Sequence, residues 1–206
     1  MKLPVHSILR ILVLLLPLWP MYVVAADEEL LEKYSFCLVC HGYDGQGNAI
    51  VSAPALAGIE PWYLAQALES YQGALRHTSA SAMEMQSAAR MIGAADLVEV
   101  RRFVALLNPG PQGKPPAAAG QLQRGAESYA QYCAACHGSD AEGNEQLAAP
   151  GLKRLNGWYL AGAWQAYLTG SRGDDNASPA SRQMRQFVLS LPADVAIEDL
   201  IAFITR

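Results

Sequence analysis

Residues 37–58 read "CLVCHGYDGQGNAIVSAPALAG", and this stretch decides the fold because it occurs twice. The second copy, "CAACHGSDAEGNEQLAAPGLKR", occupies residues 133–154. Each copy opens with two cysteines three positions apart and a histidine directly after the second. The chain has four cysteines, and all four lie in these two copies. A repeated five-residue pattern that contains every cysteine indicates two sites of the same chemical kind.

The repeat extends well beyond the two motifs. A shift of 96 residues places the triplet "WYL" at 62–64 on the same triplet at 158–160, and Arg76 on Arg172. Self-similarity over this length predicts two domains of one fold.

Both halves end in an apolar segment with helical periodicity, at residues 96–107 and 197–206. Phe103 and Phe203 in these segments are 100 residues apart rather than 96. We therefore expect about four extra residues in the second half, in the loop before its last helix.

A segment rich in proline and glycine separates the two halves. It reads "NPGPQGKPPAAAG" at residues 108–120, and such a composition favours an exposed linker over a helix or strand. Each half is small for a core made by its own side chains alone, so a large apolar cofactor would add to it. The expected organisation is a signal at 1–26, a domain at 27–108, a linker at 109–120 and a domain at 121–206.

The first 26 residues have the pattern of an export signal. Lys2 and Arg10 supply positive charge, an apolar run follows, and small residues end it at Ala26. Two prolines inside the run make it a poor membrane-spanning helix. We therefore expect cleavage near Ala26 and a periplasmic location.

The charge of the mature chain limits its partners. Loss of Lys2 and Arg10 leaves 13 basic residues against 19 acidic ones, a net charge of −6. This balance argues against a nucleic-acid partner and fits docking on a basic protein face. The charge is uneven, since residues 27–113 carry −5 and residues 114–206 carry −1.

The hydrophobic pattern predicts an all-α fold. Each half is expected to contain a helix before its cysteine motif, a helix that begins at Pro61 or after a capping Asn156, and the terminal apolar helix. The intervening segments are expected to be loops. Little of the sequence has the alternation of a strand.

The spacing of the cysteines suits one flat ligand per motif. Thiols three residues apart on a helix share a face, and the next histidine can reach the centre of a molecule held between them. C-x-x-C-H is the attachment pattern of c-type haem, while a redox dithiol, half a zinc site or a disulfide are the alternatives. Two copies without a spare cysteine favour two covalently bound haem c groups, at Cys37, Cys40, Cys133 and Cys136, with His41 and His137 on the irons.

An electron-carrying haem of this type needs a ligand opposite the histidine. Met184 is the only methionine of the second half, 19 residues before Phe203. Met85 lies 18 residues before Phe103. We therefore expect Met85 and Met184 to be the distal ligands, both in the loop before the last helix.

Other candidates remain for the first half. Met83 is the alternative to Met85, and His77 is a further one. Met91 is expected to pack in the core near the last helix. A methionine in any of these places can also be an ordinary packing residue.

Further residues have a weaker connection to the cofactors. A carbonyl near Pro54 or Pro150, each 13 residues after its histidine, could accept the outer N–H of the imidazole, although a simple turn is equally compatible. Arg76 and Arg172 could pair with haem propionates or lie in solvent. Trp62, Trp158, Tyr63 and Tyr159 could line the haem edges, although core packing is the favoured role.

The chain resembles the two-haem class I cytochromes c of the cytochrome c4 family, over almost all of the mature sequence. The resemblance rests on both histidine motifs, on "APALAG" and "APGL" after them, and on "YLAQALESYQGALR" and "YLAGAWQAYLTGSR". It implies two tandem class I cytochrome c domains, two haem c groups whose propionates meet near the domain interface, and periplasmic electron transfer. It also implies His41, Met85, His137 and Met184 as the iron ligands.

The two halves depart from the family pattern to different degrees. Before its first cysteine the second half keeps the family's glycine and aromatic, Gly125 and Tyr129, where the terminal helices cross. The first half has Glu29 and Lys33 at these positions. We expect the helix crossing of the first half to differ.

Three functions are compatible with these features. The first is a periplasmic electron carrier between respiratory donors and a terminal oxidase or other acceptor, with peripheral membrane association left open. The alternative is a dedicated electron-transfer subunit of a dehydrogenase complex, such as flavocytochrome sulfide dehydrogenase. An enzyme such as a two-haem peroxidase is the weakest, because both halves offer a methionine where such an enzyme needs an open iron position.

Overall fold

The computed structural model describes residues 27–76, 79–110 and 118–206. Every regular element among them is a helix, which confirms the all-α prediction. None of these helices has the length and apolar character that a membrane span requires. The expected export signal, His77 and the middle of the linker lie outside the described residues.

The described residues of the first half form five α-helical segments and one 3-10 turn. Residues 27–33 are helical and lead through a turn at Tyr34 into the motif helix. The motif helix is short because Gly42, with a φ of 87°, ends it directly after the histidine. Its helices are α3 (Ser35–His41), α4 (Pro61–Gln72), α5 (Ala80–Ala89) and α6 (Leu97–Leu106), with a 3-10 turn at Ala94–Asp96 before α6.

The second half repeats the order of the α-helices, with local differences in its π-helical and 3-10 segments. The helix before its motif contains a stretch of π-helix, which the first half lacks. Its helices are α7 (Ala119–Ser128), the π segment Tyr129–Cys133, α8 (Ala134–His137), a 3-10 turn at Glu145–Leu147, α9 (Gly157–Thr169), α10 (Pro179–Ser190) and α11 (Ile197–Ile204).

The prediction of a loop before each last helix is wrong, because α5 and α10 occupy these segments. The hydroxyl of Ser79 accepts the N–H of Ala82 at 3.1 Å, and the hydroxyl of Ser178 accepts the N–H of Ser181 at 3.3 Å. Serine caps of this kind satisfy N–H groups that the first helical turn leaves free. The caps therefore start both helices, and in α5 they do so although the apolar periodicity is weak.

The position of the extra residues is also corrected. Met85 and Met184 are already 99 residues apart, so three of the four extra residues precede Met184. They lie in the connection from α9 to α10, and not directly before the last helix.

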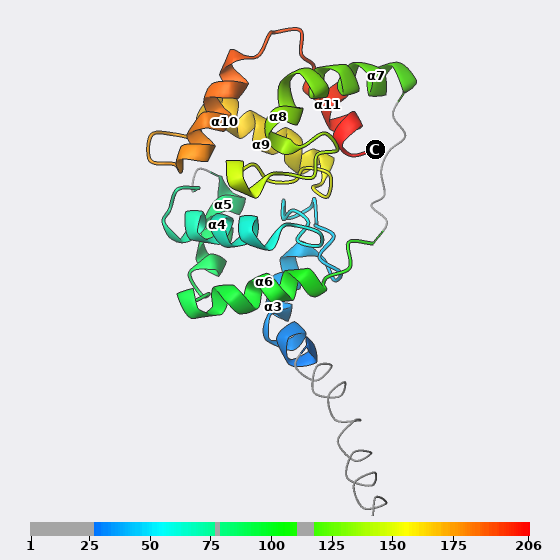
Figure 1. Cartoon of the computed structure of the whole chain (residues 1–206). Helices are drawn as coiled ribbons and strands as arrows, with labels where there is room; N and C mark the ends of the chain where they lie inside the picture. The colour runs from blue at the N-terminus through cyan, green and yellow to red at the C-terminus, as the bar shows by residue number, and fades with distance from the viewer. Residues whose placement is uncertain (1–26, 77–78, 111–117) are drawn as a thin grey trace, which may run out of the picture.

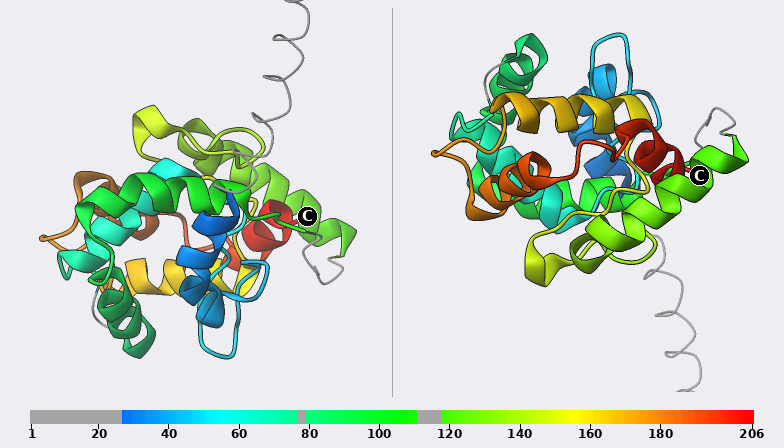
Figure 2. Two further views of the ribbon diagram at one scale, coloured as in Figure 1. Left: turned by 90° about the horizontal axis from the view of Figure 1, so that it is seen from below. Right: turned by 90° about the horizontal axis from the view of Figure 1, so that it is seen from above.

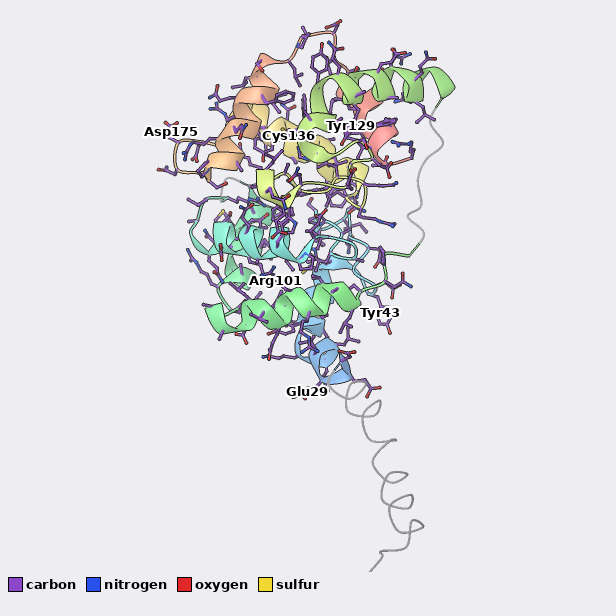
Figure 3. All side chains as sticks on the ribbon, viewed as in Figure 1. Glu29, Tyr43, Arg101, Tyr129, Cys136 and Asp175 are labelled. Carbon is purple, nitrogen blue, oxygen red and sulfur yellow. The ribbon has the colours of Figure 1, made fainter. Side chains whose placement is uncertain are left out.

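Each half has its own buried core. In the first half Tyr34 packs on Phe103, with ring centroids 5.7 Å apart. In the second half Tyr129, labelled in Figure 3 where α7 and α11 meet, packs on Phe203 at 5.2 Å. Both contacts join the helix before the cysteine motif to the last helix, as the class I cytochrome c resemblance implies.

The residues at the two helix crossings differ in size. A Cβ atom added to Gly125 would lie 2.0 Å from the backbone oxygen of Asp199, so α7 and α11 approach as closely as backbones can. Gly125 lies four residues before Tyr129, and the residue four before Tyr34 is Leu30, whose side chain is buried in the first core. Because a leucine side chain needs more room between two packed helices than a glycine does, we expect a wider crossing in the first half.

The two halves stack on one another, and α4 and α9 lie at their junction (Figures 1 and 2). Pro61 occupies the first turn of α4, as predicted. Asn156 lies at the capping position of α9, but the prediction that its side chain caps the helix is wrong. Its Oδ1 instead accepts the N–H of Ala55, at 2.8 Å, and its Nδ2 donates to the carbonyl of Gln46, at 3.0 Å.

Candidate functional site

A cavity of about 660 Å³ lies in the first half and reaches the junction of the halves. Its wall contains Cys37, Cys40, His41 and Met85, which are all four site residues predicted for this half. A volume of this size is typical of sites for large organic ligands. The structure therefore brings together residues that are up to 48 positions apart in the sequence.

Both histidines are held in the same way. Nδ1 of His41 lies 2.6 Å from the carbonyl oxygen of Pro54, and Nδ1 of His137 lies 2.7 Å from that of Pro150. Since a carbonyl can only accept, Nδ1 is the donor and Nε2 keeps its lone pair. The predicted carbonyl acceptors are confirmed, and each ring presents one nitrogen suited to a metal.

Burial keeps the two histidines neutral. Their side chains are buried, and burial lowers the pKa of His41 and of His137, an effect that the hydrogen bonds to Pro54 and Pro150 oppose. A neutral imidazole is the form that binds iron.

The cysteines are free thiols rather than disulfides. Burial raises the pKa of Cys37 and of Cys133 to about 11, so these thiols are neutral at physiological pH. Among the described residues no cluster of three or more histidine, cysteine or acidic side chains offers a metal site. Cys37 and Cys40 lie in the apolar cavity wall, where thioether bonds to a large ligand could form.

The methionines of the first half differ clearly in burial. Met85 is half-buried, packs on the first core and lines the cavity, whereas Met83 is 57% exposed. The expectation that Met91 lies in the core is wrong, because its side chain is 76% exposed beyond the end of α5. The geometry favours Met85 over Met83 as the ligand opposite His41.

Met184 occupies the corresponding place in the second half. It lies on α10 as Met85 lies on α5, and its side chain is half-buried. The expectation that Met184 pairs with His137 rests on this repeat, since neither residue lines the described cavity.

The second half completes the wall of the first cavity. Trp158, Tyr159 and Ala163 from α9 line it together with Tyr63 from α4. Core packing was the favoured expectation for these aromatic residues. Tyr63, Trp158 and Tyr159 line the cavity instead. Trp62 is not in this wall.

Two arginines meet at the junction of the halves. Arg76 and Arg172 both line the cavity and are half-buried, so the alternative of a fully solvated position is wrong. Nη2 of Arg172 donates to the hydroxyl of Tyr63 at 2.9 Å. Its Nε is buried and has no hydrogen-bond partner among the described residues.

The arginines make this end of the cavity positive. Burial alone would raise the pKa of Tyr63, but Arg172 and Arg76 outweigh it and lower the pKa. Arg172 and Arg76 also act to lower the pKa of Tyr159, but burial outweighs them and raises that pKa to about 12. A positive, partly unsatisfied end of an apolar cavity is suited to an anionic group.

These observations fit haem c in the first half. The wall of an apolar cavity contains two thiols, a histidine with Nε2 available and a methionine. A buried guanidinium N–H that has no partner among the described residues lies at the end where propionates would bind. The second half has the same thiols and the same histidine geometry.

The sequence analysis missed Glu60. It is the counterpart of Asn156 at the offset of 96, and it also reaches the other half, where its Oε1 accepts the N–H of Gly151 at 2.9 Å. The shared repeat position was the available signal, and the different residue types hid it.

Comparison with known proteins agrees with this site. Residues 122–206 match the family model for cytochrome c. The chain is 30% identical over 149 residues to the thiosulfate dehydrogenase electron acceptor of Thiomonas intermedia (strain K12), over 68% of this chain and 65% of that protein. It is 29% identical over 152 residues to the FixP subunit of the cbb3-type cytochrome c oxidase of Azorhizobium caulinodans, over 70% of this chain and 49% of that protein.

The fold has a solved counterpart of similar length. Cytochrome c4 of Acidithiobacillus ferrooxidans superposes with a TM-score of 0.67 at 22% identity, over 83% of this chain and 98% of that one. A cytochrome c domain implies covalently bound haem c, and both C-x-x-C-H motifs are consistent with it. The chain therefore carries a cytochrome c domain at residues 122–206, and its two halves together have the tandem cytochrome c fold of cytochrome c4.

Proposed function

We propose that the chain is an exported electron carrier with two covalently bound haem c groups, one in each half. The observation that carries the proposal is the repeated arrangement of two thiols and a histidine whose Nδ1 is bound to a proline carbonyl. Haem bound there would supply an iron that alternates between the ferric and ferrous states.

The proposal assigns each site residue a role. Cys37 and Cys40 attach the first haem and Cys133 and Cys136 the second. His41 and His137 would bind the irons through Nε2. Met85 and Met184 would supply thioether ligands, which favour ferrous iron and raise the reduction potential.

The protein around these residues serves fast electron transfer. Apolar side chains of α4, α5 and α9 exclude water from the first cavity, so little solvent has to reorganise when its charge changes. The histidine rings are fixed by the proline carbonyls, and the ligand geometry can stay the same in both oxidation states.

The partners are proposed from the relatives. The names of two relatives describe an electron acceptor of a thiosulfate dehydrogenase and a subunit of a terminal oxidase. We therefore expect redox proteins as partners, with the chain acting as a carrier rather than an enzyme, in the periplasm after cleavage near Ala26. The chain spans 65% and 49% of the length of those relatives. The alternative is a dedicated electron-transfer subunit of a dehydrogenase complex.

The test is to express the full chain in a host that attaches haem c and to measure covalent haem per protein. Two haems that titrate as one-electron couples are expected, and the double variant C133A/C136A should retain one. Absence of covalent haem would overturn the proposal. The native mass in a gently prepared extract separates a free carrier, near the monomer or dimer mass, from a subunit that migrates with a catalytic chain.

A further inference from the structure

Two hydrogen bonds cross the junction of the halves at equivalent positions. Glu60 and Asn156 directly precede α4 and α9 and are 96 residues apart. Oε1 of Glu60 accepts the N–H of Gly151 at 2.9 Å, and Oδ1 of Asn156 accepts the N–H of Ala55 at 2.8 Å. All four residues are half-buried or buried, so these bonds are partly shielded from water.

Each of these bonds ends on the peptide group that holds a histidine. The N–H of Gly151 and the carbonyl of Pro150 belong to one peptide group, and that carbonyl is 2.7 Å from Nδ1 of His137. The N–H of Ala55 and the carbonyl of Pro54 are related in the same way to His41, at 2.6 Å. A side chain of each half is therefore connected, through one peptide group, to the histidine of the other half.

The two connections differ in charge. Glu60 offers a carboxylate to its peptide, whereas Asn156 offers a neutral amide. A negative charge at the N–H end polarises a peptide group and makes its carbonyl oxygen a stronger acceptor, because linked hydrogen bonds reinforce one another. A stronger acceptor at Nδ1 makes the imidazole a stronger donor to a metal at Nε2.

We propose that Glu60 is a positioning residue for the haem site of the opposite half and lowers the reduction potential of that second haem through the Pro150–Gly151 peptide and His137. A more basic histidine stabilises ferric iron relative to ferrous iron. The neutral Asn156 has a weaker effect on His41, so the residue pair separates the potentials of two otherwise similar sites. This inference rests on the proposed function, since it requires haem in both halves.

The test is the variant Glu60→Gln in the haem-loaded full chain, which keeps an oxygen for the Gly151 N–H and removes the charge. Spectroelectrochemical titration at about pH 8, where a carboxyl group is ionised, is expected to show a higher potential for the second haem. The expected shift is at least threefold in its redox equilibrium, or about 28 mV on the scale of 59 mV per tenfold for one electron. The first haem should shift by less than half as much.

Glu69→Gln is the matched control, because Glu69 is an exposed carboxylate on α4, the helix that Glu60 directly precedes. An equal shift in this variant would show a general effect of charge and would overturn the inference. Histidine ¹⁵N NMR of the reduced protein provides a second readout. Glu60→Gln should move the Nδ1–H resonance of His137 and leave that of His41 in place.

The reciprocal variant Asn156→Asp places a carboxylate on the Ala55 peptide and should lower the potential of the first haem. The inference fails if both variants contain two haems and neither changes a potential or a histidine resonance. That result leaves the proposed function intact, whereas loss of covalent haem from the unmodified chain would remove both.

Discussion

The two halves make the same aromatic contact, but the number of residues between the tyrosine and the first cysteine differs. Tyr34 lies three residues before Cys37, and Tyr129 lies four residues before Cys133. In the second half the π segment at Tyr129–Cys133 absorbs the additional residue, as π-helical insertions do. In the first half a turn at Tyr34 separates two helical segments instead.

The comparison shows what the fold keeps fixed. The cysteine motif and the contact with the last helix keep their geometry, with ring centroids 5.7 Å apart for Tyr34 and Phe103 and 5.2 Å apart for Tyr129 and Phe203. The backbone between them adapts. The crossing adapts as well, with a glycine in one half and a buried leucine, Leu30, in the other.

The largest effect is expected from Gly125→Ala. The added Cβ would lie 2.0 Å from the backbone oxygen of Asp199, and a backbone atom cannot move aside as a side chain can. We expect a loss of about 2–4 kcal/mol in the free energy of unfolding of the second half, measured by urea denaturation.

Gly120→Ala is the control for this change, in the same helix. A Cβ there meets nothing closer than a side-chain nitrogen of Arg124 at 3.6 Å. It should be neutral or slightly stabilising, because alanine favours a helix more than glycine does. Equal losses in both variants would contradict the close crossing.

The next effect concerns the distal ligands. Met85→Ala should remove the absorption band of thioether-ligated ferric haem from the first half and lower its potential, because the thioether favours ferrous iron. Met184→Ala should do the same in the second half. Optical spectra and redox titration of the haem-loaded variants are the measurements.

Met83→Ala is the matched control, two residues away on the same helix and 57% exposed. Its spectrum and potentials should match those of the unmodified protein. A loss of the thioether band in this variant, with Met85→Ala unchanged, would reverse the assignment.

Much of the fold followed from the repeat and from hydrophobic periodicity. The helices around both motifs and the last helix of each half were predictable, because their apolar residues recur at helical spacing. Helix α5 was not, since its apolar periodicity is weak and a serine cap supports its start. In α10 the apolar residues Met184, Phe187 and Val188 do recur at helical spacing, and this signal was overlooked.

The candidate site was predictable where chemistry fixes the spacing, as with Cys37, Cys40 and His41, which the structure places in one cavity wall. The contribution of the second half to that wall was not, because it depends on how two domains stack. The roles of Glu60 and Asn156 across the junction were hidden for the same reason.

A smaller effect on stability is expected from removing an ion pair, and the two halves have ion pairs that differ in burial. Nε and Nη2 of Arg124 donate to both carboxylate oxygens of Asp199, at 2.6 and 3.1 Å, and this carboxylate is buried. In the first half Lys33 pairs with Asp96 and Glu99 at the surface. A buried carboxylate that loses its partner costs more than an exposed one.

Arg124→Ala should therefore lower the urea midpoint by several times the change caused by Lys33→Ala. The two variants are compared at pH 7 in the same buffer. Equal changes would contradict the difference in burial, and a larger change in Lys33→Ala would reverse it.

The smallest effect is the pH dependence of the Lys33 ion pairs. Hydrogen bonds from Lys33 lower the pKa of Asp96 and of Glu99 below their ordinary values of 3.8 and 4.5. A lowered folded-state pKa gives stability that is present above the unfolded-state value and is lost as the pH falls through the folded-state value. The midpoint difference between the unmodified protein and Lys33→Ala should thus be present at about pH 7 and shrink below about pH 4. Because these carboxylates are exposed, raising the salt concentration at pH 7 should reduce the same difference, and a difference independent of both pH and salt would assign the role of Lys33 to packing.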